Sequence, residues 1–422
     1  MKVLWITNIP LPEATAMLTG NKELKASGGW LVGAASALIK DENVSLCIAS
    51  VSDKVRDLKI LKGADITHYV IPLGRGNEIY NKDYEGYWKR INAEVCPDIV
   101  HIHGTEFTQG LAYVNACGSS NVVVSIQGMK SAYYYYYYYY GLSVVDIIRN
   151  LTVRDLLRGS ILRGKRKFMK SGKLETELIS KVEHIIGRTS WDRARTWSIN
   201  PNALYHFCNE TLRSEFYKCE RWKYTDCEKH SIFMSQAGYP IKGLHQLLRA
   251  LVFIKRSYPD VKVRVAGADI TNVTGLRGLI HYTGYGKIVR KMILKYGLED
   301  NVEFTGPLDA EGMIKEYLRA NVFVSPSSIE NSPNSLGEAQ ILGTPCISSY
   351  VGGAMDMMSG NEENLYRFEE IEMLAYKICR IFQNREKQVD MSEVARKRHC
   401  AETNQRRLLD IYRCITANEF NH

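Results

Sequence analysis

The chain has 422 residues, of which 45% are hydrophobic and 24% are charged, and its formal net charge is +9. This length is sufficient for two ordinary domains, and the composition is typical of a soluble globular protein. No apolar run reaches the ~18 residues of a transmembrane helix, and the opening MKVLWITNIP predicts a first strand rather than a signal peptide.

The positive charge favours an anionic partner, and the candidates are nucleic acid, anionic lipid and a phosphorylated substrate. The chain contains no helix-turn-helix, zinc-finger or RNA-recognition motif, so we expect no nucleic-acid partner. Its ten cysteines have no regular spacing, which suits reduced thiols in a cytoplasmic protein. Cys208, Cys219, Cys227 and His230 are close in sequence, but their spacing matches no common zinc pattern, and we expect no metal site.

The first half of the chain predicts alternating strands and helices. Residues 8–25 are expected to form a long loop, and Gly28-Gly29 comes directly before a helical pattern that runs through Leu38. Two glycines at a helix start let the backbone approach a ligand and leave N–H groups free to bind it. Strands are expected at 2–7, 44–51, 67–71, 97–104, 121–126 and 181–187, and helices at 84–95 and after Arg188.

Two polar side chains come at the ends of predicted strands in this half. His103 ends the strand at 97–104, and Gln127 follows the strand at 121–126. Ligands bind at the carboxyl ends of strands in open parallel sheets, so we expect His103, rather than His101, to face a ligand. The amide of Gln127 can orient a ligand but cannot carry a proton at neutral pH.

A run of tyrosines and a basic stretch follow. If Tyr133-Tyr140 is helical, it presents hydroxyl-tipped aromatic rings on every face, and such rings suit a boundary between apolar and polar phases. The stretch Arg154-Lys173 carries eight cations against Asp155 alone, interleaved with apolar residues. This pattern predicts contact with an anionic membrane surface. A domain boundary is expected near residues 205–210.

The second half predicts a further set of strands, at 231–235, 261–266 and 301–305. Lys242 and Gly243 precede a helix in which Leu244, Leu247, Leu248, Leu251 and Ile254 recur at helical spacing. Gly267 follows the strand at 261–266, at a place where a nucleotide base can lie. Further helices are expected at 284–296, 309–318 and 404–417.

The stretch from 321 to 353 contains the strongest functional pattern. A buried strand at Val322–Val324 leads into a loop that holds Glu330, and a helix is expected to follow with Ser332 as its N-cap and Pro333 as its first residue. Glu338 lies on this helix. The N-terminus of a helix favours a phosphate, while the two carboxylates can accept hydrogen bonds from sugar hydroxyls. Together these features predict a site for a nucleotide sugar.

Glu330 and Glu338, with seven residues between them, resemble the Glu-x7-Glu motif of the retaining glycosyltransferases of family 4. The segment Ser327-x-x-Glu330-Asn331-Ser332-Pro333, the Gly343-Thr344-Pro345 turn and the Val351-Gly352-Gly353 loop resemble the same family. The resemblance covers nearly the whole chain and is strongest from Ser231 to Met358. It implies an α/β protein of the GT-B fold, with two Rossmann-like domains facing across a cleft and a C-terminal helix that crosses back to the first domain. The expected domains are 1–207 with about 404–422, for the acceptor, and 208–403, for the donor.

The resemblance also implies a reaction and a set of site residues. The reaction is metal-independent transfer of a hexose from a nucleotide diphosphate sugar with retention of configuration, and no cofactor is needed. Family members commonly have a histidine where this chain has Gln127 and an arginine where it has Ala237. The implied catalytic residues are Glu330, Lys242 and Gln127. The resemblance assigns the diphosphate to Lys242, Gly28, Gly29, Asn334, Ser335 and Leu336, the ribose to Glu338 and the base to Gly267, with Ser332 as a further donor-binding residue. Glu330 is expected to bind the donor-sugar hydroxyls, and Gln127 and His103 to orient the sugar or the acceptor.

The acceptor follows less directly. A cytoplasmic protein with a tyrosine run and a basic amphipathic stretch suggests a lipid-linked glycan at the inner membrane face, in capsule, O-antigen or exopolysaccharide synthesis. One alternative is a non-catalytic protein that binds a nucleotide sugar or a glycan, which the residues Gln127 and Ala237 favour. Another is a different two-domain sugar enzyme, such as an epimerase or a phosphorylase, although no cofactor lysine site for a phosphorylase is found.

Overall fold

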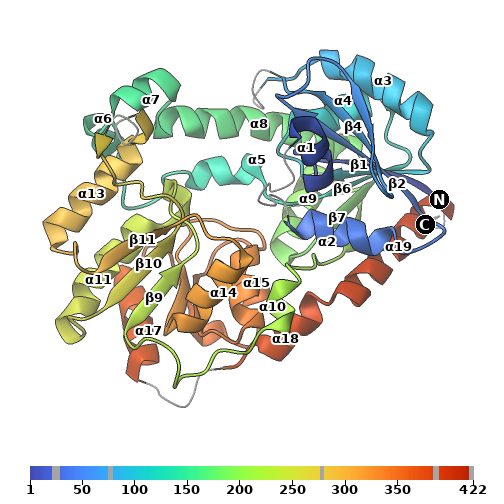
Figure 1. Cartoon of the computed structure of the whole chain (residues 1–422). Helices are drawn as coiled ribbons and strands as arrows, with labels where there is room; N and C mark the ends of the chain where they lie inside the picture. The colour runs from blue at the N-terminus through green and yellow to red at the C-terminus, as the bar shows by residue number, and fades with distance from the viewer. Residues whose placement is uncertain (21–28, 75–78, 276–279, 384–388, 418–422) are drawn as a thin grey trace. The chain divides into compact units, whose positions relative to one another are not determined.

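The computed structural model describes residues 1–20, 29–74, 79–275, 280–383 and 389–417 of the chain. Contacts between these residues divide the chain into two compact units (Figure 1). The first unit comprises Met1–Ala132, Lys167–Arg213 and Arg398–His422, and the second comprises Tyr133–Arg166 and Ser214–Lys397. The chain therefore passes more than once between the units.

The described part of the first unit is built on an eight-stranded sheet, in the order β3-β4-β2-β1-β5-β6-β7-β8. Neighbouring strands are parallel except for β3, which runs antiparallel to β4. The central strands are apolar and buried on both faces, as expected of a parallel sheet covered by helices. The strands are β1 Lys2–Ile6, β2 Ser45–Ser52, β3 Lys59–Lys62, β4 Thr67–Pro72, β5 Ile99–His103, β6 Val122–Ser125, β7 His184–Gly187 and β8 Leu204–Phe207.

Helices cover this sheet, and the last helix of the chain is among them. They are α1 Pro12–Thr19, α2 Gly29–Leu38, α3 Asp83–Val95, α4 Thr108–Cys117, α5 Lys130–Tyr133, the main part of α8 Ile161–Lys181, α9 Ser190–Ile199 and α19 Ala401–Ala417. Tyr412 of α19 is fully buried and accepts a hydrogen bond from the Trp5 indole of β1 at 3.0 Å. Gln405 of the same helix donates to the Ala37 carbonyl of α2. The predicted return of the C-terminal helix to the first domain is thus confirmed.

The described part of the second unit is built on a six-stranded sheet in the order β11-β10-β9-β12-β13-β14, and all of its strand pairs are parallel. The strands are β9 Ser231–Met234, β10 Lys262–Ala266, β11 Val302–Gly306, β12 Val322–Ser325, β13 Cys346–Ser349 and β14 Leu365–Tyr366. Both units therefore have the Rossmann-like α/β architecture that the sequence predicted.

The longer helices of the second unit each bury one apolar face. In α11 Leu244–Ser257, the leucines at helical spacing are buried in the core of this unit, as their periodicity predicted. The other helices are α6 Val144–Arg149, α7 Val153–Arg158, α10 Glu215–Lys218, α13 Gly284–Tyr296, α14 Ala310–Arg319, α15 Asn334–Ile341, α16 Ala354–Met357, α17 Ile371–Gln383 and α18 Ser392–Arg398, with the single 3₁₀ turns η1 Tyr134–Tyr136, η2 Pro240–Lys242 and η3 Glu362–Asn364.

Several local predictions differ from the structure. Part of the loop expected at 8–25 is helix α1, which begins at Pro12, a residue suited to a first helical turn. The tyrosine run does not form one helix, because α5 ends at Tyr133 and gives way to η1. The segment Tyr133–Arg166, which the sequence prediction assigned to the first domain, makes its contacts within the second unit. Among the described residues, no helix combines the length and the apolar character needed to cross a membrane.

Candidate functional site

Glu330 lies in the second unit, in the loop between β12 and α15, and its carboxylate is held by two side chains. The Lys242 ammonium is 2.6 Å from a Glu330 carboxylate oxygen, and the Ser327 hydroxyl donates to the same oxygen at 2.8 Å. Both members of the ion pair are largely buried, with side-chain exposures of 18% for Lys242 and 12% for Glu330. The structure thus brings together two predicted site residues that are 88 positions apart in the sequence.

Two glycines allow the backbone to approach this loop closely. Gly243 has φ +75°, and a Cβ at this position would lie 1.7 Å from the Pro326 carbonyl oxygen. Gly352 has φ +52°, and a Cβ there would lie 1.9 Å from the Glu330 carbonyl oxygen. The N–H of Gly353 also donates to the Glu330 carbonyl at 3.1 Å. The turn at Lys242 therefore packs against the start of the loop that carries Glu330, and the Val351-Gly352-Gly353 loop packs against the Glu330 backbone itself.

The charge of Lys242 is secured by its surroundings. Burial acts to lower the pKa of Lys242, but the neighbouring Glu330 carboxylate and Tyr239 outweigh burial and raise this pKa above its usual value. Lys242 therefore carries a full positive charge at neutral pH. Among the described residues, the Glu330 carboxylate forms an ion pair with this ammonium, and a fixed ammonium can also attract an anionic group such as a phosphate.

The helix after Glu330 begins one residue later than predicted. Pro333, not Ser332, is the N-cap of α15, and it makes no side-chain capping bond. The Ser332 hydroxyl instead lies 3.5 Å from the Met357 sulfur. The N–H of Leu336 already donates to the Pro333 carbonyl at 3.0 Å, so the backbone amides of Asn334 and Ser335 are the better candidates for binding a phosphate at this helix end.

The other positions that the sequence analysis considered for donor binding also lie in the second unit. Glu338 is on α15 and is 5% exposed. Gly267 follows β10 with φ +108°, its N–H donates to the Gly306 carbonyl, and no atom lies within 4 Å of the Cβ position. Ala237 is buried in the apolar core of the second unit. No cation stands at position 237, and Lys242 is the charged group that the structure places beside Glu330.

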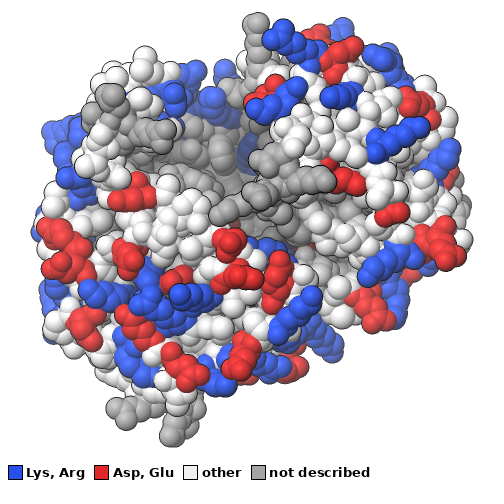
Figure 2. Space-filling view, viewed as in Figure 1, with Lys and Arg blue, Asp and Glu red and all other residues white. Residues whose placement is uncertain are grey.

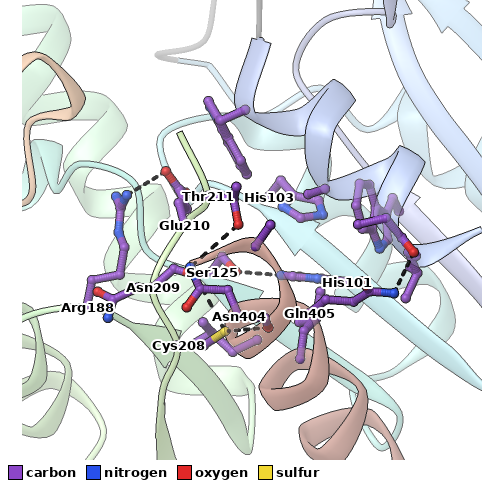
Figure 3. Close-up of a pocket in the computed structure, with 18 of the residues that line it drawn as sticks. His101, His103, Ser125, Arg188, Cys208, Asn209, Glu210, Thr211, Asn404 and Gln405 are labelled. Atoms are coloured by element: carbon purple, nitrogen blue, oxygen red, sulfur yellow. Dashed lines mark hydrogen bonds and ion pairs between the residues drawn. The ribbon is translucent and has the colours of Figure 1, made fainter. Parts of the chain in front are cut away.

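The first unit has its own cavity, of about 60 Å³, at the carboxyl ends of β5, β6 and β7 (Figure 3). Apolar side chains from β1, α2 and α19 form most of its wall, and polar side chains come from the strand ends and from the segment after β8. The lining residues include Trp5, Trp30, Leu38, His101, His103, Ser125, Arg188, Glu210, Asn404 and Leu408.

His103 lines this cavity without a hydrogen-bond partner. It is 7% exposed, and neither ring nitrogen is bonded within the described residues. The neighbouring His101 is bonded on both sides, to Tyr412 and to Ser125, each at 2.5 Å. Burial lowers the pKa of His103 well below its usual value, so the ring is neutral at pH 7. A buried, unpaired imidazole in a cavity wall has one donor and one acceptor to offer to a ligand or to water.

Gln127 occupies a different environment from the one that the sequence suggested. Its amide donates to a carboxylate oxygen of Glu210 at 2.5 Å, and its carbonyl oxygen is 3.4 Å from the Arg188 guanidinium. Arg188 and Glu210 form a buried ion pair at 2.6 Å, and His399 bonds the Glu210 carbonyl. Gln127 is therefore part of a network that joins the ends of β6, β7 and β8.

Two further carboxylates near this edge were not singled out from the sequence. The Glu106 carboxylate accepts the N–H of Gly128 at 2.9 Å, and burial raises its pKa. Burial also raises the pKa of Glu175 to about 7, although this carboxylate accepts from the Ser131 N–H and the Thr105 hydroxyl. Glu106 is the third residue after β5, so the rule that ligands bind at strand ends is the signal that identifies it.

Gly28 lies outside the described residues, and Gly29 is the first residue of α2. The predicted role of this pair in diphosphate binding stays a prediction. Within the residues that the structure describes, no group of three or more His, Cys, Asp or Glu side chains is arranged to hold a metal ion.

Residues 221–398 match the family described as glycosyl transferases group 1. This part of the chain is a group 1 glycosyltransferase domain. It contains Lys242, Glu330 and Glu338, and the predicted family assignment is confirmed.

Curated relatives match a part of the chain. The chain is 25% identical over 179 residues to a D-inositol 3-phosphate glycosyltransferase from Corynebacterium urealyticum, which covers 42% of this chain and 41% of the relative. It is 31% identical over 119 residues to the enzyme of the same name from Mycolicibacterium vanbaalenii, which covers 27% of this chain and 24% of the relative. The chain thus spans less than half the length of the curated relatives that it matches.

Solved structures resemble the whole chain. A sucrose-phosphate synthase from Thermosynechococcus elongatus has a TM-score of 0.68 at 16% identity and covers 99% of this chain and 100% of its own. An E. coli trehalose-6-phosphate protein bound with UDP-2-fluoro glucose has a TM-score of 0.62 at 12% identity, with 98% and 99% coverage. At these identities the likeness shows the fold, which is the GT-B arrangement of two Rossmann-like domains.

Proposed function

We propose that this chain transfers a hexose from a nucleotide diphosphate sugar to a glycan acceptor, with retention of the anomeric configuration. The observation that carries the proposal is the Lys242–Glu330 pair, fixed by two close-packed glycines beside the N-terminus of α15, in a domain of the group 1 family. An ammonium next to free helix amides suits a diphosphate, and the adjacent carboxylate suits sugar hydroxyls.

The proposed reaction needs a leaving group that can accept negative charge. As the bond between the sugar C1 and the diphosphate oxygen breaks, the Lys242 ammonium and the amides of Asn334 and Ser335 stabilise the charge that develops on the diphosphate. The acceptor hydroxyl oxygen forms the new bond to C1, and its proton passes to the departing phosphate oxygen. Glu330 orients the donor sugar through its hydroxyls, and Glu338 binds the ribose. As in the resembling family, no step requires a metal or a cofactor.

The acceptor side is assigned to the first unit. His103 is neutral and unpaired in the wall of a mostly apolar cavity, where it can both donate to and accept from an acceptor hydroxyl. Gln127 acts indirectly in this proposal, because its amide helps to hold Arg188 and Glu210 at the same edge. His103 is therefore the residue we assign to acceptor orientation.

The acceptor itself is proposed to be a lipid-linked glycan at the inner face of a membrane, in the synthesis of a surface polysaccharide. The protein would then lie on an anionic membrane surface through Tyr133-Tyr140 and Arg154-Lys173. Support comes from the exposure of Tyr135, Tyr139 and Tyr140, at 58%, 43% and 53%, and from the cations of the basic stretch.

The decisive experiment is a panel of nucleotide diphosphate sugars incubated with the purified full chain, with release of the nucleoside diphosphate as the readout. We expect slow hydrolysis of one donor without acceptor and faster turnover with a glycan acceptor. NMR of the product gives the configuration at C1. If one donor in the panel binds to the wild type but no donor is turned over, the transferase proposal is wrong.

A second candidate function is binding of a nucleotide sugar without transfer. Gln127 favours it, because its side chain is engaged by Glu210 and Arg188 at a position where the resembling family commonly has a histidine. The two candidates differ in one result: a binding protein raises its melting temperature with the donor but releases no nucleoside diphosphate.

A further inference from the structure

The short helices α6 and α7 present apolar side chains outward. Val144, Val145 and Ile148 of α6 are 45%, 53% and 54% exposed, and Val153, Leu156 and Leu157 of α7 are 73%, 72% and 75% exposed. We call these six residues the α6–α7 tip. Within each helix the three positions have the spacing of a single helix face. Soluble proteins rarely expose so many large apolar side chains in one short segment unless the surface contacts another phase or a partner.

Both helices are capped at their N-termini, and α7 also makes polar contacts to the segment at the start of α13. The Ser143 and Asp146 side chains cap the start of α6, and Thr152 and Asp155 cap α7 in the same way. The buried Asp155 carboxylate also accepts the N–H of Gly284 at 2.7 Å. The Thr152 hydroxyl donates to the Tyr282 carbonyl at 2.8 Å.

These contacts reverse the usual pattern of a surface helix. In α7 the residue buried against the second unit is Asp155, while the leucines point away from it. In α6 only Ile147 is buried. The outward apolar face therefore belongs to folded, capped helices and does not result from a frayed or loosely packed segment.

Basic residues outnumber acidic residues in the segment that carries the tip. From 143 to 170 the acidic residues are Asp146 and Asp155, and both serve as helix caps. The basic residues of the same segment are Arg149, Arg154, Arg158, Arg163, Lys165, Arg166, Lys167 and Lys170. Figure 2 shows Lys and Arg beside an uncharged surface in this part of the second unit. Apolar side chains bordered by cations match a bilayer, whose acyl region lies a few ångströms below anionic headgroups.

We infer that the α6–α7 tip inserts into the outer few ångströms of an anionic lipid bilayer, with the surrounding arginines and lysines on the headgroups. This assignment rests on the proposed function for the presence of a membrane-bound acceptor, and it names the element that makes the contact. It also changes the emphasis of the sequence prediction, because Val153, Leu156 and Leu157 are more exposed than the tyrosines of the preceding run.

The test is flotation of the purified full chain with vesicles of phosphatidylcholine and phosphatidylglycerol at a molar ratio of about 3:1, and with vesicles of phosphatidylcholine alone. We expect the wild type to bind the anionic vesicles, and the double variant Leu156→Ser, Leu157→Ser to bind roughly tenfold more weakly. Arg158→Ser with Arg163→Ser should also bind roughly tenfold more weakly, with a smaller dependence on salt.

The matched control is Met373→Ser with Tyr376→Ser on α17. These side chains belong to the same unit, are 39% and 60% exposed, and lie outside the tip. This variant should bind vesicles like the wild type. Because Leu156 and Leu157 are already exposed, their replacement should leave the melting temperature unchanged, which separates a lost contact from a folding defect.

Leu157→Trp reports insertion directly. Its fluorescence should shift to shorter wavelength on anionic vesicles and should be quenched by lipids brominated near the headgroup end of the acyl chains. Equal binding of Leu156→Ser, Leu157→Ser and the wild type would overturn the inference. So would self-association without lipid that these serines abolish, because the tip would then be a protein interface. If the tip variant hydrolyses the donor at the wild-type rate, membrane binding by the tip and the proposed catalytic function are tested independently of each other.

Discussion

Replacing Glu330 by glutamine should change three measurable properties in different directions. The Lys242 ammonium and the Glu330 carboxylate are 2.6 Å apart, with side-chain exposures of 18% and 12%. Removing one partner of a fully buried pair costs about 3–5 kcal/mol, and we expect about 1–3 kcal/mol here because both groups retain some solvent. For a domain of this size that corresponds to a fall in melting temperature of a few degrees.

The same substitution frees Lys242 for an anionic ligand. In the wild type a phosphate must compete with the Glu330 carboxylate for this ammonium, whereas in Glu330→Gln it does not. We expect the dissociation constant of the matching nucleoside diphosphate to fall roughly threefold to tenfold, which corresponds to about 1 kcal/mol. Transfer should nevertheless slow by about 10²–10³, because the contacts of Glu330 with the donor-sugar hydroxyls are weakened.

The assays are isothermal titration with the nucleoside diphosphate, kinetics of donor turnover and thermal unfolding. Lys242→Ala should weaken diphosphate binding at least tenfold and slow turnover as well. Glu228→Gln is the control for stability, since it removes an ion pair with Arg264 at 2.6 Å in the same unit, outside the site. If Glu330→Gln weakens diphosphate binding as much as Lys242→Ala does, the competition argument is wrong.

Three further substitutions test other parts of the molecule. Gly243→Ala should destabilise the second unit by about 3 kcal/mol or more, because the new Cβ would lie 1.7 Å from the Pro326 oxygen at φ +75°, whereas Gly238→Ala has open space and should be tolerated in the same thermal unfolding measurement. The folded pKa of Glu175 is raised from 4.5 to about 7, so the folded state binds more protons and stability should fall by about 3 kcal/mol as pH rises from about 4.5 to 7. Glu175→Gln should remove that part of the pH dependence of the melting temperature, and an unchanged slope would refute the assignment. His103→Leu should raise the melting temperature, because it removes an unpaired buried imidazole, yet it should raise KM for the acceptor and leave donor hydrolysis intact.

The sequence predicted the alternation of strands and helices well where apolar periodicity is strong. Helix α13 was expected at 284–296, and the structure has Gly284–Tyr296. Strand β8 was not predicted, because Leu204–Phe207 is four residues long and only His206 within it is buried. Strand β3 was missed for a similar reason: it is an edge strand with largely exposed side chains and carries no buried face to produce a pattern.

The candidate site, like the fold, could be predicted from the sequence only in part. The position of Glu330 before a helix could be predicted from the local pattern, whereas placing Lys242 at the same site required the resemblance to a family. The ion pair between them was not predicted, because 88 residues separate the two. The partnership of Gln127 with Glu210 was not predictable, because Glu210 follows the unpredicted β8 and was placed at a domain boundary. The exposed leucines of α7 were interpreted as part of an amphipathic stretch, and only the buried contacts of Asp155 show which way they point.

The bond between Trp5 and Tyr412 joins residues 407 positions apart, and it has a consequence for biosynthesis. The first unit draws on the beginning, the middle and the end of the chain, so its core remains incomplete until residues 401–417 have left the ribosome. All residues of the second unit emerge before then, and we expect it to fold first. During this interval Trp5, His101 and the wall of the cavity are uncovered, which makes the nascent first unit the part of the protein that most needs a chaperone.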